Sequence, residues 1–126
     1  MLFIHKKLIN RLSKPHKEPG MVCCYAQSQS MASITSRAIL LMNHDTLKVL
    51  FLNFFSTKVV HTVQWNIADL SRHSFRAGIQ LASVWSFDAG GQHWRFQIMK
   101  VILPLGSMQG DFLDFLQQYI VHENEQ

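Results

Sequence analysis

The sequence has few of the residues that hold small folds together covalently. Its only two cysteines, Cys23 and Cys24, are adjacent, so their Cα atoms lie about 3.8 Å apart, closer than a disulfide usually allows. If they belong to a strand, their side chains point to opposite faces. We therefore expect two free thiols and no disulfide framework, a pattern typical of a reducing compartment such as the cytoplasm.

The motifs of catalysis and metal binding are also missing. The sequence contains no C-x-x-C, H-E-x-x-H, G-x-S-x-G or P-loop pattern, and its seven histidines share no ligand spacing. Asp111 and Asp114 lie three positions apart on a predicted helix, where such acids serve the helix dipole more often than acid–base chemistry. We therefore predict no catalytic residue, no cofactor and no metal site, and a protein that is not an enzyme.

Long apolar runs are absent too. No stretch approaches the roughly 20 apolar residues of a membrane span, and Lys6 and Lys7 interrupt the N-terminal apolar residues before they could form an export signal. We expect a cytoplasmic protein. A chain of 126 residues that is 48% hydrophobic is suited to one globular domain with its own core.

Charge is sparse and unevenly placed. Lys, Arg, Asp and Glu make up 16% of the chain, and the net charge is +4. The first 17 residues hold five basic residues and no acid, whereas the other 109 residues hold seven basic and eight acidic ones. Nucleic-acid-binding domains usually carry a basic stripe over one face. Only the N-terminal segment could supply one here, so we do not favour nucleic acid as the partner.

The N-terminal segment has the pattern of a short amphipathic helix. At about 100° per residue, Met1, Ile4, Leu8 and Leu12 share one face of residues 1–12, opposite the basic residues. The next eight residues, SKPHKEPG, read as a linker because two prolines and a glycine oppose regular structure. We therefore divide the chain into an arm and linker, residues 1–19, and a globular domain, residues 20–126.

The clearest strand signal surrounds a glycine turn. Trp85 and Phe87 fall on one face of residues 79–87, together with Ile79 and Leu81. After the turn Asp88–Gly91, Trp94, Phe96 and Ile98 alternate with polar residues. This period predicts an antiparallel hairpin with one buried face. We expect these aromatic residues in the core rather than on a surface that stacks bases.

Further apolar runs predict more strands. Residues 34–42 and 47–54 flank the polar turn Asn43–Thr46, and residues 59–65 alternate with Val63 and Trp65 on one side. Residues 49–55, VLFLNFF, are apolar on both strand faces. They are either covered on both sides or expose a patch that marks an interface. The interface hypothesis assigns Phe51, Phe54 and Phe55 to contact with a second copy or another protein.

The C-terminal region predicts a helix over residues 108–122. Phe112, Phe115, Leu116, Tyr119 and Ile120 have helical spacing, and Ser107 offers an N-cap hydroxyl. These residues would cover one face of a sheet. Strands followed by a single terminal helix predict an α+β domain.

These elements together resemble a bacterial pleckstrin-homology-like (GRAM-like) domain over about residues 20–122. The resemblance rests on residues 34–40 and 63–70, and on Trp94–Ile98 leading into Met108–Leu116. It implies a curved antiparallel sheet or partly open barrel of about six to seven strands, with the C-terminal helix capping an open corner. Some relatives bind phosphoinositides through a basic loop between the first two strands. The matching residues 26–31, AQSQSM, have no Lys or Arg, so this property does not carry over.

The leading hypothesis is a non-enzymatic interaction module that binds a protein partner, forms a homo-oligomer or associates with a membrane surface. The arm could lie on anionic lipid, bind a groove of a partner, or only pack on the domain. Its contact residues would be Lys6, Lys7, Leu8, Arg11, Leu12 and Lys14. A small nucleic-acid-binding protein that uses the basic arm is the alternative.

Overall fold

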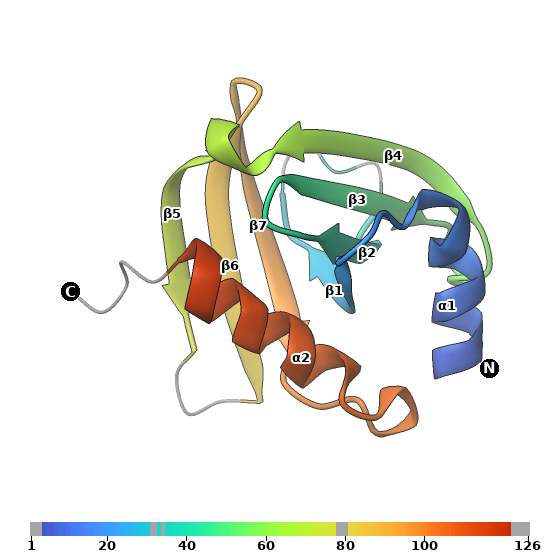
Figure 1. Cartoon of the computed structure of the whole chain (residues 1–126). Helices are drawn as coiled ribbons and strands as arrows, with labels where there is room; N and C mark the ends of the chain where they lie inside the picture. Colours follow the sequence, from blue (N-terminus) through green and yellow to red (C-terminus); the bar gives the residue numbers. More distant parts are fainter. Residues whose placement is uncertain (1–3, 31–32, 34, 78–80, 122–126) are drawn as a thin grey trace.

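The computed structural model describes residues 4–30, 33, 35–77 and 81–121. They form one open sheet of seven antiparallel strands with a helix near each end of the chain (Figure 1). Across the sheet the strands run in the order β4-β3-β2-β1-β7-β6-β5. The α+β class and the C-terminal capping helix predicted from the sequence are confirmed. The strands are β1 (Val22–Ser28), β2 (Arg37–Met42), β3 (Thr46–Leu52), β4 (Val59–Asn66), β5 (Ser71–Arg76), β6 (Ala82–Ala89) and β7 (Gln92–Met99).

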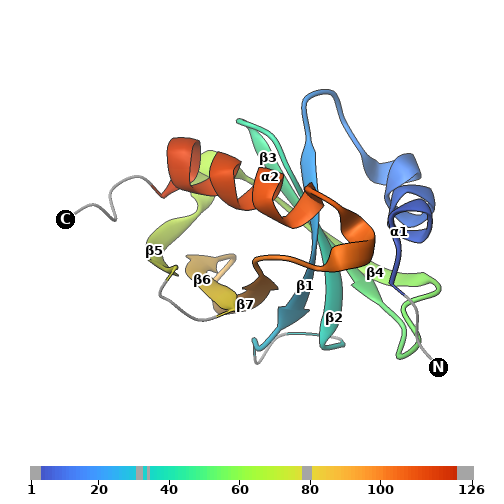
Figure 2. The same ribbon diagram turned by 90° about the horizontal axis from the view of Figure 1, so that it is seen from below.

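Strands β1, β2 and β3 are buried on both faces. One face lies in a core that includes β6, β7 and the C-terminal helix α2 (Met108–Phe115), which we call the α2 core. The other face lies in a second core beneath the N-terminal helix α1 (Lys6–Ser13), which we call the α1 core. Figure 2 shows the two helices on different sides of the sheet. The adjacent cysteines divide between them, because Cys24 belongs to the α2 core and Cys23 to the α1 core.

The hairpin of β6 and β7 matches its predicted pattern. Trp85 and Phe87 pair across the strands with Phe96 and Trp94, and all four are buried in the α2 core. Gly90 and Gly91 form the turn at φ values of 60° and 78°, which glycine adopts without steric cost. The prediction for Leu81 is wrong, because it precedes β6 and is 78% exposed. Ile79 lies outside the described residues.

Strand β3 ends earlier than the apolar run suggests. It stops at Leu52, and a register shift follows in which Phe51 pairs with His61 and Leu52 with Val59. The shift leaves Val60 as an extra residue, a β-bulge, and turns Val59 toward the α1 core while Val63 and Trp65 face the α2 core. Both faces of β3 are thus covered, which explains why its sequence does not alternate.

Helix α1 packs on the sheet through the face expected to be apolar. Ile9 is fully buried in the α1 core, Leu8 is 9% exposed, and Ile4 and Leu12 are half-buried. The helix runs from Lys6 to Ser13, and His5 caps its start by accepting the N–H of Leu8 at 3.3 Å. Of the three hypotheses for the arm, the structure supports packing. Leu8 is therefore not free to enter lipid, and the membrane contact predicted for it is wrong, whereas the contact predicted for half-buried Leu12 stays a prediction.

Helix α2 closes a gap between β1 and β7. These strands pair only where Gln27 meets Gln97 and Ser28 meets Phe96. Beyond that point the fully buried Gln109 fills the gap. Its side-chain oxygen accepts the N–H of Tyr25 at 2.8 Å, and its amide nitrogen donates to the carbonyls of Tyr25 and Met99, both at 2.9 Å. One side chain thus replaces the missing strand pairing.

The local form of α2 differs from the prediction in two respects. The Ser107 hydroxyl does not cap the backbone but donates to the Asp111 carboxylate at 3.0 Å. The α-helix ends at Phe115 and continues as one π-helical turn, Leu116–Ile120. Phe112 and Leu116 are fully buried as expected, whereas Tyr119 is 48% exposed.

Candidate interaction surface

An exposed aromatic pair marks the turn between β3 and β4. Phe54 is 69% exposed and Phe55 is 60% exposed, and their rings meet edge to face at 5.1 Å. We call these two residues the aromatic tip. Phe51, assigned to the same surface from the sequence, is fully buried against Trp94 in the α2 core. The sequence-based interface is therefore wrong for Phe51, whereas Phe54 and Phe55 do lie at the surface.

The aromatic tip is held by a dense set of hydrogen bonds. The Asn53 side-chain oxygen accepts the N–H groups of Thr57 and Lys58 at 2.8 and 3.1 Å, and the backbone N–H of Asn53 donates to the Lys58 carbonyl. Ser56 is buried at a φ of 58°, and its hydroxyl lies 2.9 Å from that of Tyr25 on β1. The turn is therefore anchored to the sheet, and its two aromatic rings need little ordering before they bind something.

Positive charge borders the aromatic tip. The Arg37 guanidinium lies 4.8 Å from the centroid of the Phe54 ring, a cation–π distance, and Lys58 is exposed at the end of the turn. Arg37 also lines a cavity of about 280 Å³ together with Ile4 and Tyr25. Ile4 immediately precedes α1, so this cavity lies between the start of the helix and the Arg37 side chain that contacts Phe54.

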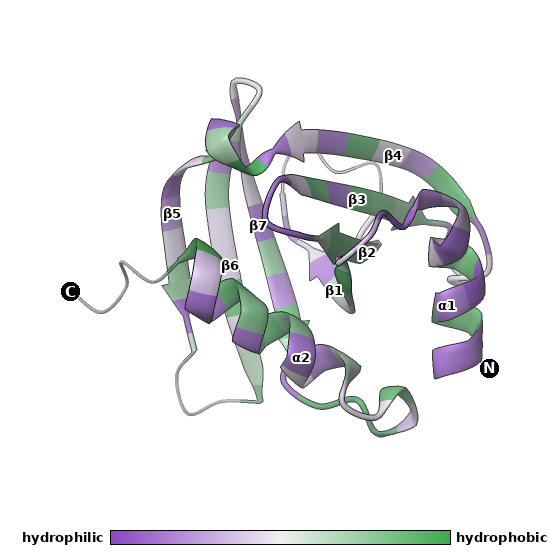
Figure 3. Ribbon diagram, viewed as in Figure 1, coloured by the Kyte–Doolittle hydropathy of each residue, from purple (hydrophilic) through white to green (hydrophobic). Residues whose placement is uncertain are grey.

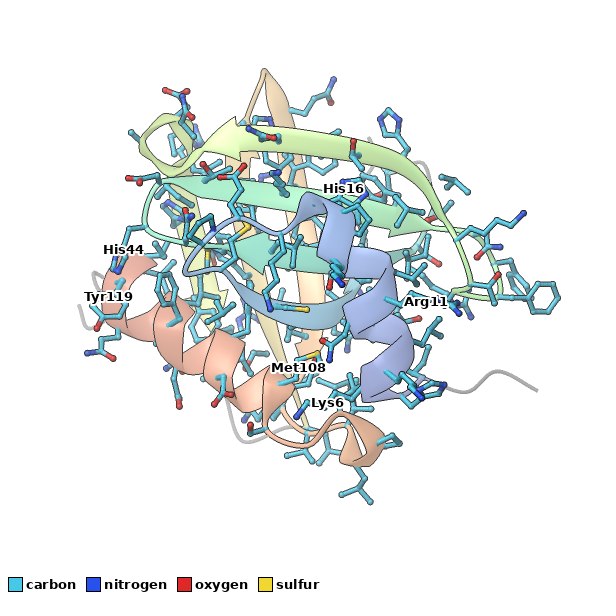
Figure 4. All side chains as sticks on the ribbon, turned by 45° about the vertical axis from the view of Figure 1, so that its right-hand side comes forward. Lys6, Arg11, His16, His44, Met108 and Tyr119 are labelled. Atoms are coloured by element: carbon cyan, nitrogen blue, oxygen red, sulfur yellow. The ribbon has the colours of Figure 1, made fainter. Side chains whose placement is uncertain are left out.

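Helix α1 carries a basic stripe on its outer side. Lys7, Arg11 and Lys14 are exposed at spacings of four and three residues, which places them on one face. Figures 1 and 2 place α1 and the turn between β3 and β4 on the same side of the molecule. Figure 4 shows Arg11 on the outer side of the helix. The basic residues predicted from the sequence therefore belong to a helix on the same side of the molecule as the turn that carries the aromatic tip, although their apolar neighbours face the sheet.

A polar cleft separates α1 from the start of α2. It encloses about 340 Å³, and Lys6 and Asn10 from α1 face Ser107 and Asp111 across it. In Figure 4, Lys6 and Met108 lie near each other at this cleft. Cys23 forms part of its floor.

The cysteines are poor nucleophiles in this setting. Burial raises the pKa of the Cys23 thiol to about 11, although nearby Lys17 and a hydrogen bond with Ser13 oppose the shift. Burial also raises the pKa of Cys24 well above its ordinary value, and neighbouring Cys23 adds to this effect. At neutral pH both are protonated thiols, so the cleft holds no activated thiolate.

Other reactive groups do not converge. Among the described residues, no three His, Cys, Asp or Glu side chains come together as a metal ligand set. His44 instead packs against Phe115 and Tyr119 at ring distances of 4.9 and 4.7 Å, joining the turn between β2 and β3 to the end of α2 (Figure 4). None of the helices in the described part of the chain combines the length and the apolar character needed to cross a bilayer.

Sequence reasoning missed the arrangement that links these elements. Nothing in the pattern indicated that Arg37 reaches Phe54 or that Gln109 bridges two strands. The only available signal was the phenylalanine pair outside an alternating pattern, next to the turn-forming Asn53.

Searches with the sequence against protein-family models and against curated proteins found no match.

Proposed function

We propose that the protein is a non-enzymatic module that associates with anionic membrane surfaces through the aromatic tip and the basic stripe of α1. The observation that carries the proposal is the pair of exposed phenylalanines on an anchored turn with arginine and lysine beside it. Aromatic side chains favour the membrane interface, and basic groups favour anionic head groups. Among the described residues of the arm, Ile9 is buried in the α1 core and Ile4 and Leu12 pack partly against it, so we assign to the helix a contribution mainly of charge.

The expected energies are those of a reversible peripheral contact. Complete burial of one Phe side chain is worth about 1.5–3 kcal/mol, so two rings at the observed exposure contribute about 2–4 kcal/mol. Each basic residue near an anionic surface adds about 1 kcal/mol. Lys7, Arg11 and Lys14 together therefore match the aromatic tip in strength, and both parts are needed for firm binding.

Two further lines of support concern the family and the compartment. The seven-stranded order and the capping α2 agree with a pleckstrin-homology-like domain, and we propose that assignment. The described residues of the loop after β1 include no Lys or Arg before Arg37, which supports general attraction to anionic lipid rather than recognition of one phosphoinositide. The two free, buried cysteines support a cytoplasmic location.

Vesicle co-sedimentation of the full chain tests this proposal. Replacing both Phe54 and Phe55 with Ser should lower partitioning onto phosphatidylserine-containing vesicles by about 30-fold or more. Leu81→Ser is the matched control, since Leu81 is even more exposed than the two phenylalanines but lies outside the proposed surface. Lys7→Gln should weaken binding several-fold, whereas Arg76→Gln on β5 should not. Removal of residues 1–17 is a poor test because it would uncover the α1 core.

Three results would refute the proposal. They are absence of binding by the wild-type protein, equal binding to neutral and anionic vesicles, and equal losses for Leu81→Ser and the double Ser variant. Binding to nonspecific DNA that falls steeply with salt and ignores the phenylalanines would favour the nucleic-acid alternative instead.

A further inference from the structure

The two edges of the sheet differ in their protection against strand pairing. Edge strand β5 has a register irregularity between Ser71 and Ser74, and Arg72 adopts a φ of 54° there. Arg72 and Arg76 place exposed charge on that edge. Irregularity and charge are the usual means by which an edge avoids pairing with another strand. Edge strand β5 is therefore protected.

Over most of its length, edge strand β4 lacks the register irregularity and the exposed charge that protect β5. Its sequence, VVHTVQWN, contains no Lys, Arg, Asp, Glu or Pro. Its single irregularity, at Val60, lies near one end and leaves His61–Asn66 in regular register with β3. In Figure 1 no strand or helix of the described residues lies beside the outer edge of β4, and Figure 3 shows hydrophilic and hydrophobic residues alternating along the strand.

The backbone bonds of the sheet show which groups of β4 point outward. The N–H of Ile67 donates to the carbonyl of Asp45, which lies before β3. In an antiparallel strand, alternate residues bond to the same neighbour. Val63 and Trp65 therefore bond to β3, while Thr62 and Gln64 direct their N–H and C=O groups away from the sheet. The N–H of Asn66 also points outward, but Asn66 is the N-cap of the 3₁₀ turn Ile67–Asp69, so its carbonyl accepts a bond within that turn. The outward groups form a row of donors and acceptors along this edge of β4.

We infer that β4 pairs with β4 of a second copy of this chain to form one continuous antiparallel sheet. A two-fold axis perpendicular to the sheet at Gln64 places Gln64 opposite Gln64 of the second copy. Thr62 then faces Asn66 of the second copy. The two Gln64 residues exchange two backbone bonds, and the N–H of each Asn66 donates to the carbonyl of the Thr62 opposite it. A register centred on Thr62 is excluded because it would require Val60, which lies in the bulge.

Self-pairing is favoured over other occupants because the strand is self-complementary and neutral. No like charges meet in this register, and Val63 of one copy lies opposite Trp65 of the other on the same face. An unrelated extended peptide could use the same edge, but the strand itself carries no Lys, Arg, Asp or Glu that would select a partner sequence by charge. Because the pairing uses one short strand of each copy, we expect it to bury less than the roughly 1,200–2,000 Å² of stable complexes, so the dimer should form only at high protein concentration. This inference does not rest on the membrane proposal.

Sedimentation velocity across a concentration series up to about 1 mM tests the inference, since weak contacts require such concentrations. The wild-type protein should shift from monomer to dimer. Gln64→Pro should remain monomeric, because it removes an outward N–H while sparing the bonds to β3. Gln64→Lys should also remain monomeric, since it sets two like charges on the axis. Gln118→Lys on the exposed side of the π-helical turn is the matched control and should dimerise normally.

Two residue-level measurements identify the interface. Amide exchange at Thr62, Gln64 and Asn66 should slow as concentration rises, while exchange at Val63 and Trp65 should not change. Gln64→Cys should form a cross-linked dimer on mild oxidation, since paired residues in such a position have Cα atoms about 5.5 Å apart, within disulfide range. Gln118→Cys should not. A monomer at every concentration, or a dimer that survives Gln64→Pro, would overturn the inference.

Discussion

Gln109 offers the sharpest test of how this fold is closed. Replacement by Ala removes three hydrogen bonds at once and leaves the N–H and C=O of Tyr25 and the C=O of Met99 without their partner. A buried polar group left unsatisfied costs about 1–3 kcal/mol, but these backbone groups are only partly buried, so the lower figure applies to each. Together with the cavity left by the side chain, we expect a loss of about 3–4 kcal/mol in unfolding free energy.

The assay is urea denaturation followed by tryptophan fluorescence, since Trp85 and Trp94 report on the α2 core. Gln118→Ala is the control, because Gln118 belongs to the same helical segment but is exposed. It should change stability by no more than about 0.5 kcal/mol. Gln109→Glu separates the roles of the two amide atoms: a carboxylate can still accept from Tyr25 but cannot donate to either carbonyl. That variant should regain stability on acidification, when the protonated carboxyl can donate one bond.

A loss below about 1 kcal/mol for Gln109→Ala, equal to that of the control, would refute the bridging role. It would mean that water satisfies the edges of β1 and β7 as well as the glutamine does. The helix would then be held by its apolar contacts alone.

The remaining predictions concern the core and the thiols. Trp94→Ala should cost about 3–5 kcal/mol in calorimetric or urea unfolding, because Trp94 is 5% exposed and its indole donates to the Ala89 carbonyl; a cost near zero would place it outside the core. Because the pKa of Cys23 is raised to about 11, its alkylation by iodoacetamide at pH 8 should be about 100-fold slower than that of an unperturbed thiol. Folding stability should also fall as pH rises from about 9 toward 11, since the unfolded chain loses the thiol proton first. Fast labelling of the native protein at pH 8 would contradict both expectations.

The sequence predicted best those elements whose burial is one-sided. The hairpin of β6 and β7 was predicted from its alternation, because one face lies in the α2 core while the other face is mostly exposed along β7 and mostly half-buried along β6. Strand β5 was missed because SRHSFR is polar and its pairing with β6 is irregular. The strand containing Phe51 was recognised, but its end was placed too late. A run of apolar residues does not reveal where a bulge and a turn begin.

The candidate surface was predictable only in part. Phe54, Phe55, Lys7, Arg11 and Lys14 are exposed as expected. The amphipathic pattern of residues 1–12 could not say whether Leu8 and Leu12 face lipid or the protein's own sheet, because both environments are apolar. Which environment Leu8 and Leu12 enter depends on the outer faces of β1–β3. These faces are apolar and would be exposed to water without α1. The position of Arg37 beside Phe54 depends on tertiary contacts between β2 and a distant turn. Local periodicity in the sequence carries no information about such contacts.

The bridge made by Gln109 bears on how the chain can fold during synthesis. Its partner Tyr25 precedes it by 84 positions, so β1 leaves the ribosome long before the residue that satisfies its free edge. Until then, the backbone edge of β1 has no native cover, and the α2 core lacks Phe112 and Leu116. At translation rates of about 5–20 residues per second, this exposed interval lasts several seconds. Nascent chains of this protein should therefore be clients of chaperones that shield apolar sheet surface until α2 emerges.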